Sequence, residues 1–379
     1  MSNVFIDTFE LTYKTDFDTM KKMTENFKKY KTHKNNVEYV CVEFAAMGFI
    51  IKSKKCSDKE RRDRNKNYRI SIIVDPNRVY IPHTNIKHIC NTEDFDKMID
   101  KMDMLISFWF EDTGITLNDF TLTRIDITKD IHDIPEKIIR EYIMIMRRMT
   151  LYSGYELNRQ LEENTENFRP EDSFNAINVS RQVEFVVYNK HRAAIDQNYS
   201  DEDKEYYEDT MRVEARCTKG FIKKKTKHMS VSRALRHIFG RRYEYLNDIY
   251  NSVFLYYTDT CFVQNYWQNK IIKDKFQTKQ KRVEKMHWLI IRMSSKQNYT
   301  LAEALENYKG SDDAKLNLLN YFDKAGISPI PIQRYDIPFM QSIDSILEFD
   351  EPNEADRKYS NYLKQKTRSK EVFFHEPVR

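Results

Sequence analysis

Residues 123–130 read Thr-Arg-Ile-Asp-Ile-Thr-Lys-Asp, and this stretch decides the fold that the sequence predicts. Alternating apolar and polar residues are typical of a β-strand with one face in the core, because successive side chains point to opposite faces. Ile125 and Ile127 then face the core. The other face is shared by Arg124, Asp126, Thr128 and Asp130.

Two later stretches are also predicted to be strands with a charged face. Residues 183–190 read Val-Glu-Phe-Val-Val-Tyr-Asn-Lys, and residues 211–217 read Met-Arg-Val-Glu-Ala-Arg-Cys. If the three strands are neighbours in one sheet, their polar faces form one charged surface that contains a tyrosine. The second and third strands contribute Glu184, Tyr188 and Lys190, and Arg212, Glu214 and Arg216.

A charged surface of this kind has two interpretations. Carboxylates bind hard cations such as Mg²⁺ and Mn²⁺, and nearby positive charge helps a tyrosine hydroxyl to act as a nucleophile. Arg and Glu on adjacent strands also form ordinary cross-strand ion pairs. Periodicity alone favours the ion pairs.

The amino-acid sequences of the three segments, and their order, resemble the motifs of one family. TRIDITKD at 123–130, EFVVYNK at 184–190 and RVEAR at 212–216 resemble, in this order, the RID…D, YxK and R-E-R motifs of the Rep_trans family of replication initiators. The likeness spans roughly residues 4–219. That family includes initiators of rolling-circle plasmids and some phages, and relaxase-like proteins of integrative conjugative elements.

The resemblance implies a fold and a reaction. The fold is α+β, with a central, mostly antiparallel sheet of the nicking-endonuclease type, flanking helices and a mainly helical C-terminal region. In the reaction Tyr188 attacks a DNA phosphate, which gives a 5′-phosphotyrosyl link and a free 3′-hydroxyl for a polymerase. Lys190 assists phosphate binding or tyrosine ionisation.

The resemblance also implies which residues bind metal and DNA. Asp126 and Glu214 are the first candidates for ligands of Mg²⁺ or Mn²⁺, and Asp130 and Glu184 are the second. Backbone phosphates are contacted by Arg124, Arg212 and Arg216.

One feature departs from the better-known rolling-circle nickases, which use a His-x-His pair as metal ligands. No His-x-His occurs in this chain. His83, His88 and His191 are candidates for a single ligand, although a surface or core position is the commoner role of a histidine. Alternative nucleophiles lie downstream of Tyr188, at Tyr199, Tyr206 and Tyr207.

Composition argues against several other classes of protein. No GxGxxG or GxxxxGK[ST] motif occurs, which disfavours nucleotide hydrolysis by a P-loop. Five cysteines without a CxxC pair predict reduced thiols rather than disulfides or a zinc site. The apolar stretches are shorter than a bilayer span and no signal peptide is visible, so we expect a cytoplasmic protein with no membrane segment.

Positive charge is concentrated after the third strand. Residues 216–242 hold ten Lys and Arg and no acid, whereas the whole chain has a net charge of +5. A run of this kind attracts phosphate backbones, and we expect Lys223, Lys224 and Lys225 to contact DNA. A solvated linker is the alternative interpretation.

Periodicity and turn signals predict the remaining elements and three units. Residues 284–330 contain three short helices that resemble a helix-turn-helix unit, although compact packing without DNA contact is as common. The units are a catalytic nicking domain at 1–219, a helical DNA-binding or accessory domain at 220–345 and a charged tail at 346–379. The other predictions are strands at 3–14, 37–44, 45–52 and 68–74, helices at 91–113 and 135–149, a loop at 157–173 and an exposed helix or connection at 200–209.

Three functions compete on this evidence. The first is a replication-initiation endonuclease, whose partners are double- and single-stranded origin DNA, a host helicase and a polymerase. The second is a relaxase of a conjugative element, which uses the same chemistry. The third is a DNA-binding protein without catalysis, whose salt-sensitive duplex binding survives loss of Tyr188. The family also implies a homodimer, for which no coiled-coil heptads are visible.

Overall fold

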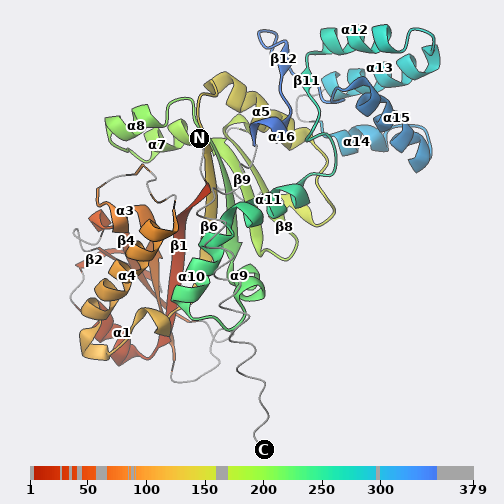
Figure 1. Ribbon diagram of the computed structural model, residues 1–379. Helices are drawn as coiled ribbons and strands as arrows, with labels where there is room; N and C mark the ends of the chain where they lie inside the picture. Colours follow the sequence, from red (N-terminus) through yellow and green to blue (C-terminus); the bar gives the residue numbers. More distant parts are fainter. Residues whose placement is uncertain are drawn as a thin grey trace, which may run out of the picture.

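A ten-stranded sheet forms the centre of the molecule in the computed structural model, which describes residues 4–25, 28–33, 36–40, 45–56, 66–83, 85–86, 89, 91–158, 170–295 and 299–347. The strand order is β2-β3-β4-β5-β1-β6-β10-β9-β8-β7, and every neighbouring pair is antiparallel. Helices surround this sheet and continue into a helical C-terminal region (Figure 1). The predicted α+β class with an antiparallel sheet is therefore confirmed.

The bounds of the elements follow the chain. The strands are β1 (Val4–Thr15), β2 (Lys28–His33), β3 (Asn36–Val40), β4 (Phe49–Lys55), β5 (Tyr68–Val74), β6 (Thr121–Ile131), β7 (Tyr155–Leu157), β8 (Ser173–Asn178), β9 (Val183–Asn189), β10 (Met211–Thr218), and the separate pair β11 (Phe262–Val263) and β12 (Phe339–Met340). The helices are α1 (Phe17–Thr24), α3 (Pro76–Tyr80), α4 (Thr92–Trp109), α5 (Glu136–Arg148), α7 (Lys190–Asp196), α8 (Asp201–Tyr206), α9 (Lys219–Thr226), α10 (Val231–Gly240), α11 (Arg242–Val253), α12 (Asn265–Lys275), α13 (Gln280–Ser295), α14 (Leu301–Glu306), α15 (Asp312–Ala325) and α16 (Ile343–Ile346).

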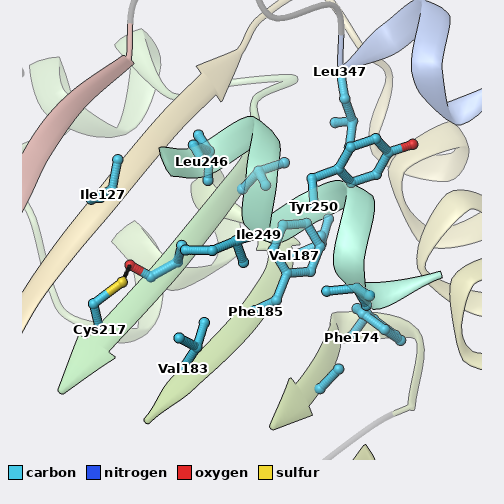
Figure 2. Packing of buried hydrophobic residues seen from close by; sticks show 14 of the residues in the cluster. Ile127, Phe174, Val183, Phe185, Val187, Cys217, Leu246, Ile249, Tyr250 and Leu347 are labelled. Carbon is cyan, nitrogen blue, oxygen red and sulfur yellow. Dashed lines mark hydrogen bonds between the residues drawn. The ribbon is translucent and has the colours of Figure 1, made fainter. Parts of the chain in front are cut away.

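One face of the central strands is a hydrophobic core. Phe185 and Val187 of β9 are fully buried, and Figure 2 shows them facing Leu246, Ile249 and Tyr250 of α11. Helices α9 and α11 pack against β6 and β10 on this face, and α10 packs against β6. Because side chains alternate along a strand, the opposite face carries the polar residues of β6, β9 and β10.

Local sequence signals explain where several elements begin and end. The Asn91 side chain accepts a hydrogen bond from Asp94 N and caps α4, as asparagine commonly does. After the last turn, Gly114 adopts φ 64°, a left-handed conformation that costs glycine little. Pro135 precedes α5, and Thr300 forms a capping box with Glu303 at the start of α14.

The structure also contains strands that we did not predict. β7 and β8 were not predicted, and they flank the loop expected at 157–173, of which residues 159–169 lie outside the described part of the chain. β2 was not predicted either, and its sequence, KKYKTH, lacks apolar alternation. Edge and near-edge strands of this kind are polar, so their periodicity is weak.

Helices α12 to α15 pack together at the upper right of Figure 1. The chain then returns towards the sheet through β12 and α16, and the hydroxyl of Tyr142 in α5 donates to Gln341 O at 3.1 Å. The division at residue 219 stays a prediction, and most of the expected charged tail lies outside the described residues. Among the described residues, no helix is both long enough and apolar enough to span a membrane.

Candidate active site

The three motif strands are neighbours, with β10 between β6 and β9. Arg212 lies opposite Asp130 on one side and Tyr188 on the other, while Arg216 lies between Asp126 and Glu184. Residues opposite each other on paired strands point to the same face. We call this surface the charged face, and its members are Arg124, Asp126, Thr128, Asp130, Glu184, Tyr188, Arg212, Glu214 and Arg216.

A buried arginine holds one end of the charged face together. Arg212 Nε lies 2.6 Å from Asp130 Oδ1, and its Nη2 lies 2.7 Å from Asp130 Oδ2. Arg212 Nη1 also donates to Asp7 Oδ1 of β1 at 2.9 Å. Burial lowers the pKa of Arg212, but the charges of Asp130 and Asp7 outweigh it and hold the pKa well above the usual range. Arg212 is 1% exposed, so its guanidinium faces carboxylates rather than solvent.

The other end of the charged face is more open. Arg216 Nε lies 2.8 Å from Glu214 Oε1, and its Nη1 lies 3.5 Å from Glu184 Oε2. Arg124 pairs with Asp126, two residues along the same strand, β6. The side chains of Arg124 and Arg216 are 40% and 31% exposed, so both guanidinium groups are within reach of a ligand in solvent.

Two side chains outside the motifs complete the hydrogen bonds of these carboxylates. Thr8 Oγ1 donates to Asp126 Oδ2 at 2.6 Å, and Asn158 Nδ2 donates to Glu184 Oε1 at 2.8 Å. Together with Asp7, these residues were missed by the sequence analysis. The acidic and polar residues of β1 are the only signal for Asp7 and Thr8, because their partners lie far away in the chain.

The hydroxyl of Tyr188 donates to Glu214 Oε2 at 3.3 Å. Burial and then the charge of Glu214 raise the pKa of Tyr188 well above its usual value of 10, while Arg212 opposes the rise. The phenol is therefore protonated at neutral pH. Glu214 is placed to accept its proton.

Asp126 and Glu214 influence each other across the face. Burial raises the pKa of Asp126 to about 6, Arg124 opposes this rise, and the charge of Glu214 adds to it. The two carboxylates lie on adjacent strands and repel each other, which the neighbouring arginines partly offset. This part of the face concentrates charge of both signs beside Tyr188.

Lys190 lies in a different position from the one we predicted. β9 ends at Asn189, and the Asn189 side chain caps α7 by accepting from Arg192 N at 3.0 Å. Lys190 is the first residue of α7, where it is 3% exposed and its Nζ lies 3.4 Å from the Tyr199 hydroxyl. Its ammonium group also lies 4.9 Å from the centroid of the Tyr207 ring.

The alternative nucleophiles have different surroundings. Tyr207 is fully buried, and its hydroxyl donates to Asn85 O at 2.6 Å. Tyr206 is 42% exposed and packs edge-on against His132. Tyr199 accepts a hydrogen bond from Lys190 through its hydroxyl. These three tyrosines lie in or beside α8, whereas Tyr188 lies on the charged face.

The charged face does not fit a metal centre as it is arranged. Within the described ranges, no three His, Cys, Asp or Glu side chains come together as a group that could hold a metal ion. Asp126, Asp130 and Glu214 each pair with an arginine instead. Of the three candidate histidines, His191 lies in α7 and His83 lies in the turn after α3. His88 lies outside the described residues.

The basic run after β10 is folded rather than a solvated linker. Lys223 and Lys224 are exposed on α9, while Lys225 Nζ lies 4.8 Å from the centroid of the Tyr245 ring. Arg242 is fully buried and donates to Val4 O at 2.6 Å. The run therefore contains exposed lysines, Lys223 and Lys224, that are available to phosphates and a buried arginine, Arg242, that stabilises the fold.

Comparisons with known proteins give a weak structural similarity. No family model matches the chain, and no curated protein matches it. A solved structure titled as that of a rolling circle replication initiator protein from Geobacillus stearothermophilus is similar over 68% of this chain and 87% of its own, with 8% identity and a TM-score of 0.37.

Proposed function

We propose that this chain is a replication initiator that nicks origin DNA with Tyr188 as its nucleophile. The observation that carries the proposal is the register of β6, β10 and β9, which brings the Tyr188 hydroxyl within 3.3 Å of Glu214 on a face lined by arginines. The resemblance of the same three segments to the Rep_trans motifs supports this reaction class.

The reaction is a phosphoryl transfer to a tyrosine. Tyr188 Oη attacks the phosphorus of a phosphodiester while its proton passes to Glu214 Oε2. The bond between phosphorus and the 3′ oxygen breaks, and that oxygen takes a proton from water and leaves as a 3′-hydroxyl, while Glu214 returns its proton to solvent. The 5′ phosphate stays on Tyr188.

The arginines have separate roles in this proposal. Arg124 and Arg216 have partly exposed guanidinium groups. They bind the phosphates that flank the scissile bond through charge-assisted hydrogen bonds. Arg212 holds Asp130 and Asp7 and so supports the face from within. Lys223 and Lys224 are exposed on α9, which packs against the other face of the sheet, and we assign them separate contacts to duplex DNA.

The requirement for Mg²⁺ or Mn²⁺ stays a prediction. Asp126 and Glu214 remain the carboxylates to test, because Glu214 accepts from the Tyr188 hydroxyl and its charge raises the pKa of Asp126. Their arginine pairs would have to open for either carboxylate to bind a cation. The roles of a host helicase, a polymerase and a second subunit also stay predictions.

A covalent-adduct assay tests the proposal. Single-stranded oligonucleotides from the DNA around the gene, labelled at the 3′ end, are incubated with the protein and Mg²⁺, Mn²⁺ or a chelator. The fragment that carries the 5′ phosphate should remain on the protein in denaturing gels. We expect Tyr188→Phe to lose this adduct by more than about a hundred-fold, since the nucleophile is absent.

Two variants at neighbouring tyrosines serve as controls. Tyr199→Phe and Tyr206→Phe should retain the adduct. Full adduct with Tyr188→Phe would assign the nucleophile to another tyrosine. If no oligonucleotide gives an adduct with either metal while duplex binding persists, the protein binds DNA without cleaving it.

A further inference from the structure

Four large aromatic side chains lie exposed around the start of α12, far from the charged face. Tyr266 and Trp267 of α12 are 69% and 39% exposed, and Tyr335 and Phe339 are 95% and 56% exposed. We call them the aromatic surface. A group of exposed aromatic rings is typical of an interaction site, because leaving large apolar side chains in water is unfavourable unless a partner covers them.

The two pairs of rings come from distant parts of the sequence, and the backbone segments that carry them lie side by side. Phe339 of β12 pairs with Val263 of β11, three residues before Tyr266. Gln264 Nε2 donates to Arg334 O at 2.6 Å, which places Tyr335 beside the same turn. Within α12, the Tyr266 and Trp267 rings are 5.3 Å apart and nearly perpendicular.

Positive charge adjoins these rings. Lys270 Nζ lies 5.2 Å from the centroid of the Trp267 ring. Tyr266, Lys270 and Lys273 recur at spacings of four and three, so they share one stripe of α12. Residues 265–295, which comprise α12 and α13, hold eight Lys and Arg against two acids, a net charge of +6, whereas the whole chain has only +5.

We infer that the aromatic surface and the lysines of α12 form a binding site for single-stranded DNA. Nucleotide bases stack on exposed aromatic rings without regard to sequence, and lysines contact the phosphates between them. An acidic protein would bind the lysines, whereas single-stranded DNA would bind the lysines through its phosphates and the rings through its bases. The inference rests on the proposed function, because nicking and unwinding create such a strand.

Binding of oligothymidylate to the full chain tests the site. A fluorescein-labelled strand of about 20 thymidines is titrated with protein and followed by anisotropy. We expect the double change Tyr266→Ala and Trp267→Ala to weaken binding by about ten-fold or more, because two stacking platforms are lost. Leu316→Ala, at a 48% exposed leucine of α15, is the matched control and should bind as the unchanged protein does.

Two further readouts separate stacking from charge. Trp267 fluorescence should be quenched by the strand, and Trp267→Phe should remove this quenching while it largely preserves affinity. The change Lys270→Ala with Lys273→Ala should reduce the slope of log affinity against log salt by about 0.7 for each cation removed. Thermal unfolding followed by circular dichroism should be unchanged in these surface variants.

Unchanged oligothymidylate affinity in the Tyr266→Ala, Trp267→Ala double variant would overturn the inference. The same holds if that variant instead abolishes self-association in sedimentation experiments, because the surface would then bind a second copy of the chain. The adduct assay with Tyr188→Phe is independent of these measurements. Absence of any adduct in the unchanged protein would overturn the proposed function and leave the strand-binding result intact.

Discussion

At the scale of single residues, the charged face consists of ion pairs as well as a candidate nucleophile. The two interpretations of the alternating strands are therefore compatible, since Arg212 pairs with Asp130 across adjacent strands as periodicity alone favoured. The same pairing fixes the strand that carries Glu214 beside Tyr188. Ion pairs on this face support the geometry on which the proposed chemistry depends.

Replacing Arg212 tests this supporting role. We expect Arg212→Met to lower the free energy of unfolding by about 3–5 kcal/mol, because it leaves the carboxylate of Asp130 buried without its guanidinium. Urea denaturation followed by circular dichroism measures the change. Adding Asp130→Asn to this variant should recover part of the loss, and a loss below about 1 kcal/mol in Arg212→Met would contradict the role.

The sequence predicts some positions of the site and misses others for physical reasons. Alternation places Asp126, Glu214 and Tyr188 on one face because a strand has a fixed period of two. It fails at Lys190, since Asn189 ends the strand by capping α7, and asparagine is a favoured N-cap. Asp7 joins the site from a strand more than a hundred residues away, which no local pattern reveals.

At the scale of elements, strands with a clear apolar face were predicted and polar strands were not. β6, β9 and β10 lie within two residues of the stretches that the sequence predicted, because their core faces are rich in Ile, Val and Phe. β8, with the sequence SFNAIN, gives no comparable alternation. Its pairing depends on β9, a tertiary contact that overrides weak local preference.

Helix α13 gives a prediction about pH. His287 Nε2 is buried and has no hydrogen-bond partner among the described residues, and burial followed by the charge of Lys273 lowers the pKa of His287 from 6.5. The unfolded chain therefore binds more protons than the folded chain at slightly acidic pH, so this residue makes stability rise with pH up to about 6.5. His287→Leu removes this contribution.

We expect His287→Leu to be more stable than the unchanged protein at about pH 5, with a smaller difference at about pH 8. Urea midpoints across this range measure both. His228→Gln, at an exposed histidine of the same chain, is the matched control. A difference for His287→Leu that stays constant with pH would show that packing rather than protonation explains it.

At the scale of the whole molecule, the helical C-terminal region is connected to the sheet at several points. Arg148 at the end of α5 is 1% exposed and donates to Pro331 O at 3.2 Å and to Met293 O of α13. Asp344 N donates to Thr258 O at 2.9 Å, and Leu347 lies close to Tyr250 of α11 (Figure 2). Residues that follow the aromatic surface thus contribute to the core behind the charged face.

This arrangement predicts that the sheet loses stability when the returning segment is changed. Leu347 is 1% exposed, and Leu347→Ala should cost about 2–5 kcal/mol, the usual range for a buried leucine. Because Tyr250 packs between Leu347 and the sheet, hydrogen exchange should accelerate in β9 and α11 together as well as in α16. Leu316→Ala on α15 should leave exchange in β9 unchanged. Faster exchange confined to α16 would instead mean that the returning segment opens on its own, and the sheet that positions Tyr188 would then not depend on it.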